Sequence, residues 1–337
     1  MRQPRPSLKG ESRGWVFLKN WTLPVAITVG ACFYFLFALV PALDEAGDRL
    51  CPVFETLLPL TIFLTLFVTF SKVDFHLMKL HRWQGAVLAV QLVLVGLVVG
   101  GILSLTSVSS LFISSFSMDR TKLLLEAVLI CIIAPCASAS PVVTAKLGGD
   151  LTQMTTFVLI SSTVTSLLIP AVFPLLEPQQ MNDSFVTAFL TIWKRLAVVL
   201  LLPLVLGAVV RHWVKPLYDW FVRTPDLGFY CWSLSLAITS GITMKNIMHC
   251  GAGLWLLAGI AVLTLVTAFI QFRTGRRIGQ VYGEHICTGQ AMFQKNTGLA
   301  IWIAYTYLTP VASIGAGCYV LWQNIINSYE LWQHHKA

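Results

Sequence analysis

The chain alternates long apolar runs with short polar connections, and most of the runs are long enough to cross a membrane. A helix needs about 20 apolar residues to span the hydrocarbon core of a bilayer. We expect a short interfacial helix at Asp183–Arg195 before the sixth span. The pattern predicts an all-α integral membrane protein with ten transmembrane helices: Trp21–Val40, Pro52–Phe70, Gly85–Leu105, Leu123–Thr144, Met154–Leu176, Leu196–Val210, Leu227–Met244, Leu254–Phe272, Ile286–Tyr305 and Val311–Leu331.

The composition agrees with this prediction and leaves no room for a soluble domain. Of the 337 residues, 56% are hydrophobic and 11% are charged, whereas an ordinary soluble domain is about 25% charged. Mean hydropathy is +0.75. The basic N-terminal segment leads into a full-length span without a small-residue cleavage site, so we interpret it as an uncleaved tail rather than a signal peptide.

Positive charge is distributed unevenly between the two sides of the predicted membrane. The formal net charge is +8, and most Lys and Arg lie in connections on the same side as the N-terminus. Because cytoplasmic loops carry the excess of Lys and Arg, we expect both termini to be cytoplasmic and the protein to lie in the plasma (inner) membrane. The basic residues then orient the chain in the lipid bilayer, and we expect no nucleic acid partner.

The cysteines and histidines do not indicate a cofactor or a metal centre. The eight cysteines lie mostly in or beside apolar segments without CxxC spacing, and the seven histidines are scattered. No P-loop, dinucleotide-binding or HExxH motif occurs. We therefore expect no cofactor, apart from Na⁺ or H⁺ as a coupling ion.

A polar linker divides the predicted spans into two sets of five. An odd number of spans in each half gives the halves opposite topology, which is the layout of an inverted repeat. The fourth span of each half is interrupted, and interruptions at corresponding places in two halves are typical of a transport site. The expected organisation is an N-terminal tail (1–20), a first repeat (21–176), a linker with the interfacial segment (177–195), a second repeat (196–331) and a C-terminal tail (332–337).

The first interruption is the segment between Pro135 and Pro141. Each proline lacks an N–H and so frees a carbonyl in the preceding turn, where it could coordinate a cation beside the hydroxyls of Ser138, Ser140 and Thr144. A kinked helix packed through small residues would give the same sequence. The matching interruption in the other half favours a site.

The second interruption carries a lysine and several amides at membrane depth. Gln290, Gln294 and Thr297 fall at i, i+4 and i+7, so we expect them to share one helical face, with Lys295 and Asn296 turned away from it. Interhelical hydrogen bonds alone explain one such residue better than five adjacent ones. We predict a polar site here, to which the single amide in the third span, Gln91, also belongs.

The lysine has three possible roles. A lysine at the bilayer centre costs about 2.5–3.5 kcal/mol on insertion scales and usually faces a cavity or a partner. Lys295 could pair with Glu126, bind an anionic substrate, or take the place of a bound cation and exchange a proton. Glu126 lies near the predicted external end of its span, where it could instead reach water. Hydroxyls at Thr239, Ser240 and Thr243 could line a substrate path or bond to their own helix backbone.

Taken together, these stretches resemble the bile acid:sodium symporter family. The resemblance rests on residues 134–144 (APCASASPVVT), 161–170 (SSTVTSLLIP) and 290–300 (QAMFQKNTGLA), with support from Gln91 and residues 320–325 (VLWQNI). It implies two inverted five-span repeats arranged as a panel domain and a core domain. In the core, discontinuous fourth and ninth spans cross and form ion sites, and an organic anion binds between core and panel.

The sequence departs from the sodium-coupled members at the places that would hold sodium. It has Ser140-Pro141 where they carry Ser-Asn, Gln290 where they carry an acidic residue, and Lys295 where they carry Asn. An ammonium about 4 Å from a sodium ion would repel it by about 4 kcal/mol at an effective dielectric constant near 20. We therefore predict that Lys295 replaces a sodium ion. A residual sodium site remains possible at Ser140, Gln290 and Gln294.

The sequence thus predicts a secondary transporter for a small organic anion and not an enzyme. Ser140 or Cys136 could serve as a nucleophile, but no His or Asp lies nearby in the spans to activate it. A sodium-independent facilitative carrier or a channel is the alternative. Bile acids and pantoate-like or pyruvate-like acids fit the same lining.

Overall fold

The computed structural model describes residues 22–109, 115–177, 184–224 and 227–336, and these form helices without strands. The expected N-terminal tail and residues 178–183 of the expected linker lie outside the described residues. The described helices are α2 (Thr22–Leu39), α3 (Pro41–Ser71), α4 (Arg82–Ser109), α5 (Ser115–Ile133), α6 (Ser140–Lys146), α7 (Leu151–Leu176), α8 (Phe185–Leu196), α9 (Leu202–Trp213), α10 (Lys215–Arg223), α11 (Leu227–His249), α12 (Leu254–Tyr282), α13 (His285–Phe293), α14 (Thr297–Tyr307) and α15 (Pro310–Lys336), with a short 3-10 turn at Phe75–Leu77.

Local signals in the sequence set several helix ends. Asp150 caps α7 by accepting a hydrogen bond from the Gln153 N–H at 2.9 Å. Ser184 caps α8 in the same way, by accepting from the Thr187 N–H. α12 ends at Gly283, whose φ of +76° is readily adopted by glycine.

The sixth predicted span differs from our expectation. Instead of an interfacial helix followed by a short span, α8 continues into α9 through a π-helical segment at Ala197–Leu201. In this wide turn the Leu202 N–H bonds to the Ala197 carbonyl, and Pro203, which follows, has no N–H with which to continue the α-helical ladder. Phe185–Trp213 is therefore one helical rod of spanning length. At the other end of the chain, α15 continues through the expected tail to Lys336.

Several of the helices can cross a bilayer. By length and composition, five segments of the described chain qualify: Arg49–Ser71, Arg82–Ser107, Leu151–Leu176, Phe185–Trp213 and Leu254–Tyr282. The pair Val25–Leu39 and Pro41–Gly47, bent by 99°, makes a sixth if it forms one broken span. The prediction of a multi-pass helical membrane protein is confirmed. The count of ten stays a prediction. By the same criteria of length and apolar composition, α5 carries too many charged residues to qualify, and α13 and α14 are each too short.

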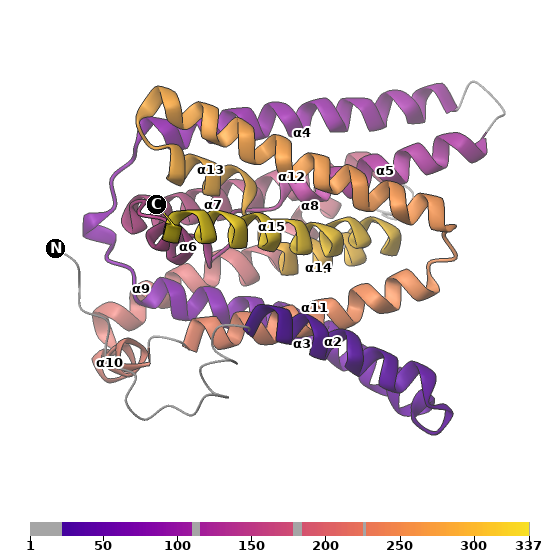
Figure 1. Cartoon of the computed structure of the whole chain (residues 1–337), viewed down its shortest axis with the longest axis horizontal. Helices are drawn as coiled ribbons and strands as arrows, with labels where there is room; N and C mark the ends of the chain where they lie inside the picture. Colours follow the sequence, from indigo (N-terminus) through magenta and orange to yellow (C-terminus); the bar gives the residue numbers. More distant parts are fainter. Residues whose placement is uncertain (1–21, 110–114, 178–183, 225–226, 337) are drawn as a thin grey trace.

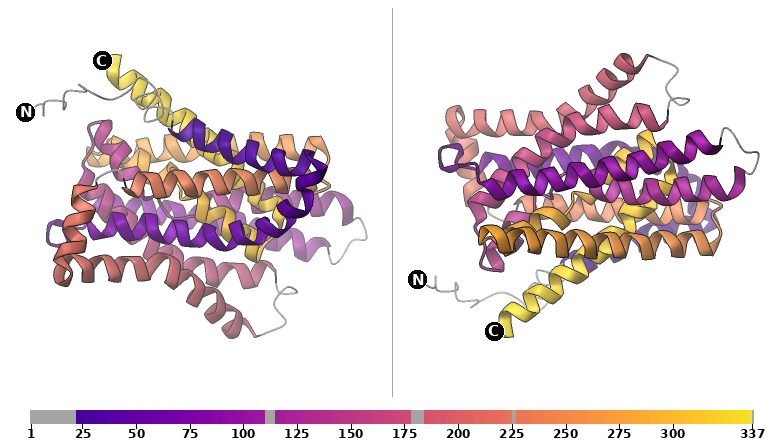
Figure 2. Two further views of the ribbon diagram at one scale, coloured as in Figure 1. Left: turned by 90° about the horizontal axis from the view of Figure 1, so that it is seen from below. Right: turned by 90° about the horizontal axis from the view of Figure 1, so that it is seen from above.

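The helices pack as two groups (Figure 1). The side group consists of α2, α3 and α11, which pack on one another, and of α9, which packs on α3. α2, α3 and α11 run along the lower edge of Figure 1. The broken-helix group consists of α4 to α7 and α12 to α15, and α15 crosses it obliquely (Figure 2). Contacts of α11 with α14 and α15, and of α3 with α14, join the two groups.

Candidate functional site

Two helices of the broken-helix group are interrupted, and both interruptions are buried. The helix that starts as α5 ends at Ile133 and resumes as α6 at Ser140. The helix that starts as α13 ends at Phe293 and resumes as α14 at Thr297. Cys136 and Lys295, near the middle of the two breaks, are each 1% exposed.

The two breaks cross and pair through their backbones. Cys136 and Lys295 form an isolated antiparallel bridge. The Ala137 N–H donates to the Gln294 carbonyl at 2.9 Å, and the Asn296 N–H donates to the Pro135 carbonyl at 2.8 Å. An unpaired backbone group in the membrane interior costs several kcal/mol. The breaks therefore satisfy each other, and the structure brings the two predicted interruptions together.

Buried amide and phenol side chains satisfy other carbonyls at the crossing. Gln91 Nε2 donates to the Ile132 carbonyl at 2.9 Å. Gln271 Nε2 donates to the Cys131 carbonyl at 3.3 Å. Sequence reasoning identified Gln91, which lies inside an apolar run, but missed Gln271, which lies at the end of its predicted span next to Phe272-Arg273.

One face of α15 holds the second break. Tyr319, Gln323 and Asn327 are spaced four residues apart, so they lie on one side of the helix. Tyr319 OH donates to the Phe293 carbonyl at 2.7 Å, and Gln323 Oε1 accepts from the Lys295 N–H at 3.1 Å. Asn327 Oδ1 accepts from Gln290 Nε2 at 3.0 Å. The four-residue spacing could have shown this stripe, but sequence reasoning did not use it.

The helical-face interpretation of the second interruption is wrong. α13 ends before Gln294, which has the extended backbone angles φ −83° and ψ 98°. Thr297 begins a new helix, and Asn296 caps it by accepting from the Leu299 N–H at 3.2 Å. Gln290 and Thr297 therefore belong to two different helices.

Lys295 does not pair with Glu126. Glu126 is fully buried and lies 3.6 Å from Lys122, which also bonds to Glu177 at the end of α7. The expectation that Glu126 reaches water is wrong as well, because packing in the full bundle covers it. Within the described chain, Lys295 Nζ has no hydrogen-bond partner and no carboxylate within 4.0 Å.

The residues of the first break have mixed environments. Ser140 is fully buried, and its hydroxyl donates to the Ala137 carbonyl at 2.7 Å and lies 3.1 Å from Cys136 Sγ. Ser161 of α7 accepts from the Cys136 N–H at 2.9 Å, so α7 also fixes the crossing. Ser138 is 8% exposed, and Thr144 is buried on α6.

Several buried oxygens around the breaks have no donor within the described residues. A buried polar atom left without a partner costs about 1–3 kcal/mol, so such atoms mark places where water, an ion or a ligand can bind. Oxygen ligands suit hard cations such as sodium, but the ammonium of Lys295 sits on the same segment. The oxygens are Gln91 Oε1, Thr144 Oγ1, Gln271 Oε1, Gln290 Oε1 and Gln294 Oε1.

Two of the three α11 hydroxyls follow the second of their two expected roles, and the third, Ser240, instead donates to the Ile27 carbonyl of α2 at 2.9 Å. Thr239 donates to the Ser235 carbonyl at 2.6 Å and Thr243 to the Thr239 carbonyl at 2.8 Å, both on their own helix. The same face packs against glycines of the other group. A Cβ on Gly317 of α15 would lie 2.3 Å from Thr243 Cγ2, and one on Gly298 of α14 would lie 3.1 Å from Ser235 Oγ.

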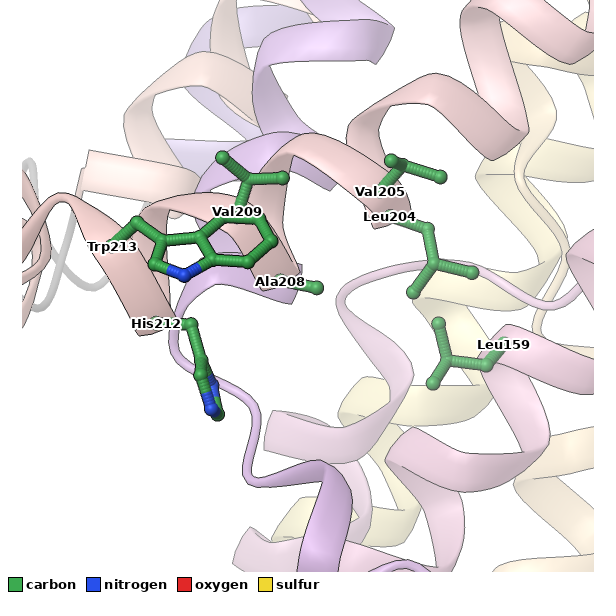
Figure 3. Close-up of a pocket in the computed structure, with 7 residues that line it drawn as sticks. All are labelled: Leu159, Leu204, Val205, Ala208, Val209, His212 and Trp213. Atoms are coloured by element: carbon green, nitrogen blue, oxygen red, sulfur yellow. The ribbon is translucent and has the colours of Figure 1, made fainter.

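Two cavities lie away from the crossing. One, of about 550 Å³, lies between α7 and α9 and is apolar except at His212 and Trp213 (Figure 3). The other, of about 580 Å³, lies between α2, α3 and α11. Neither is lined by a predicted site residue, so the candidate site is the buried crossing itself.

This geometry and one comparison define the class of the protein. A multi-pass helical bundle whose two broken helices meet at a buried polar centre is an arrangement typical of membrane transport proteins. A family model described as "Sodium Bile acid symporter family" matches residues 59–250, more than half of the chain. The chain therefore belongs to the sodium bile acid symporter family, whose members are transporters and not enzymes. No curated protein matches the chain.

Proposed function

We propose that the protein is a secondary active transporter that carries a small organic anion across the membrane by alternating access. The observation that supports this most directly is the backbone pairing of two broken helices at Cys136 and Lys295. Discontinuous helices place freed backbone groups at the bilayer midplane, which is where transporters bind substrates and ions. The anion binds beside the crossing, and movement of the two helix groups exposes it alternately to each side.

We propose that the ten helical segments form two inverted repeats. The first repeat comprises α2 to α7, in which α5 and α6 are one broken span. The second comprises α8 to α15, in which α8 with α9 and α13 with α14 each count as one span and α10 is a connection. The breaks then fall in the fourth span of each half. In this proposal the side group is the panel and the broken-helix group is the core.

We further propose that Lys295 replaces one coupling sodium ion. Its ammonium lies on the segment that would supply sodium ligands, is 1% exposed, and has no carboxylate partner within the described chain. A fixed positive charge there repels sodium and attracts the carboxylate of an anionic substrate. If the lysine loses and regains its proton during the cycle, the coupling ion is a proton. If it keeps its charge, the protein is a sodium-independent carrier.

The orientation follows from the charge pattern. We propose that the protein lies in the plasma (inner) membrane with both termini in the cytoplasm. The positive-inside rule supports this, because most Lys and Arg lie on the N-terminal side.

Uptake into liposomes tests the proposal. The purified protein is reconstituted, and counterflow is measured with labelled taurocholate, pantoate and pyruvate as probes of three anion sizes. Acceleration of entry by unlabelled internal substrate identifies a carrier and distinguishes it from a channel. For the probe that exchanges, uptake is then measured under a sodium gradient, a pH gradient, or neither.

Each outcome selects one mechanism. We expect uptake that is unchanged by sodium, and that is driven by a pH gradient if Lys295 carries the proton. Strong sodium dependence with Lys295 intact would contradict the replacement. Lys295→Met should abolish exchange, and Lys194→Met, which removes an exposed lysine of α8, is the matched control that should retain it.

A further inference from the structure

Three chemically reactive side chains meet away from the crossing, where α3 packs on α11. Lys245 Nζ of α11 lies 2.7 Å from Cys51 Sγ of α3. Glu55, one turn further along α3, contacts both partners through Oε1, at 3.3 Å from the sulfur and 3.4 Å from the nitrogen. The thiol, the amine and a proton acceptor are therefore within contact distance of one another.

Small solutes can reach this cluster. Cys51 and Lys245 border the cavity of about 580 Å³ between α2, α3 and α11, the helices along the lower edge of Figure 1. The Lys245 side chain is 34% exposed and that of Glu55 is 26% exposed. Neither group takes part in the crossing, so the proposed function leaves this cluster without a role.

We propose that Cys51 and Lys245 form a redox modification site, in which oxidation of the thiol by a peroxide leads to a reversible covalent bond between Cys51 Sγ and Lys245 Nζ. In the first step hydrogen peroxide oxidises the thiol to a sulfenic acid, its O–O bond breaks, and one water is released. In the second step the amine attacks the sulfur, an S–N bond forms, the S–O bond breaks, and a second water is released. The proton that leaves the ammonium goes to Glu55.

Proximity favours the amine as the second reactant. Sulfenic acids condense with a neighbouring thiol or nitrogen, and reacting atoms held at about 3–3.5 Å are already close to the geometry of reaction. The nitrogen of Lys245 is within that distance of the sulfur. The bond would join α3 to α11, remove the charge of Lys245, and leave Glu55 without its ammonium partner.

Peptide mass spectrometry tests the site. The full-length protein in detergent is treated with hydrogen peroxide, alkylated without a reductant and digested. We expect a linked pair of peptides, one containing residue 51 and one containing residue 245, with a mass lower by two hydrogens than the sum of the two. Dithiothreitol added before digestion should separate the pair.

Variants identify the two atoms and the proton acceptor. Cys51→Ser and Lys245→Arg should each abolish the linked pair, the second because a guanidinium keeps the charge but is a poor nucleophile. Glu55→Gln should slow its formation. The exposed thiol of Cys32 on α2 is the internal control, which peroxide should oxidise without forming a link.

Three results would overturn the proposal. The first is a Cys51 thiol that is oxidised to sulfinic or sulfonic acid, or left unmodified, with no linked peptide in folded wild-type protein. The second is a linked peptide that persists in Lys245→Arg. The third is a pair that retains an oxygen atom, because the link would then run through N–O–S rather than through a direct S–N bond. Size-exclusion profiles matching the wild type show that each variant is folded.

Discussion

Lys295 is a buried cation whose surroundings in the described chain offer it no counter-charge. Its N–H is bonded to Gln323 and its neighbours on both sides pair with the first break, so the backbone at this position is fixed. The fixed backbone holds the base of the side chain inside the buried crossing, where the residue is 1% exposed. A buried charge that weakens the fold in a membrane protein marks a candidate functional site.

Replacing Lys295 should separate stability from function. Lys295→Met keeps an unbranched side chain that is one atom shorter and removes the buried charge, so we expect it to stabilise the fold by about 1–3 kcal/mol. Thermal unfolding in detergent should show a higher midpoint temperature, while exchange of the substrate anion is lost. Lys194→Met should change neither. A lower midpoint for Lys295→Met would mean that the ammonium has a stabilising partner.

At the scale of elements, the two helix groups meet where α11 packs on α14 and α15. Glycines on α14 and α15 allow the hydroxyl face of α11 to approach closely, and Asn246 Nδ2 donates to Ser313 Oγ of α15 at 2.7 Å. Apolar side chains pack beside these groups, including Leu236 of α11 and Val320 of α15. Separation of the two helix groups here would therefore expose apolar surface as well as break the hydrogen bond.

A methyl group at Gly317 should disturb this contact. The added Cβ would meet Thr243 Cγ2 at 2.3 Å and Oγ1 at 2.7 Å, and overpacking of this kind costs about 1–3 kcal/mol. We expect Gly317→Ala to lower both the unfolding temperature and the rate of uptake.

A second substitution should restore both quantities. Thr243→Ala removes the two clashing atoms and leaves only the Cβ, at 3.1 Å. Gly100→Ala on α4, where a new Cβ would meet nothing within 4 Å, is the matched control. If Gly317→Ala alone behaves like wild type, the groups do not close at this contact during transport.

At the scale of the whole molecule, alternating access requires the side group to move relative to the broken-helix group. The backbone pairing at the crossing and the stripe on α15 connect only members of the broken-helix group. That group can therefore move as a unit. The contacts between α11 and α15 would then be among those that change.

Linking the two groups should stop transport. We expect a double variant, Asn246→Cys with Ser313→Cys, to lose uptake after treatment with a short bifunctional thiol reagent. The background is a chain whose own cysteines are replaced and which still transports. Each single variant treated in the same way should keep its activity, and retained uptake in a verified linked double variant would show that α11 and α15 do not separate.

The sequence by itself determined that this is a multi-pass helical membrane protein with two interrupted segments. Apolar runs of spanning length leave a chain few alternatives, since backbone groups in lipid must be satisfied within helices. The prolines at 135 and 141 and the polar run around Lys295 marked the breaks, because each interrupts an otherwise apolar helical span. These are local properties, and each can be recognised in one segment without its neighbours.

Only the tertiary structure decided which partners those breaks take. A freed N–H or carbonyl can bond to any group brought near it, and the choice depends on residues far away in the chain: Pro135 with Asn296, Cys136 with Ser161, Lys295 with Gln323. The same dependence overturned the pairing of Lys295 with Glu126 and the shared face of Gln290 and Thr297. Spacing predicts a common face only while a helix continues, and here the long-range pairing of the two breaks interrupts it.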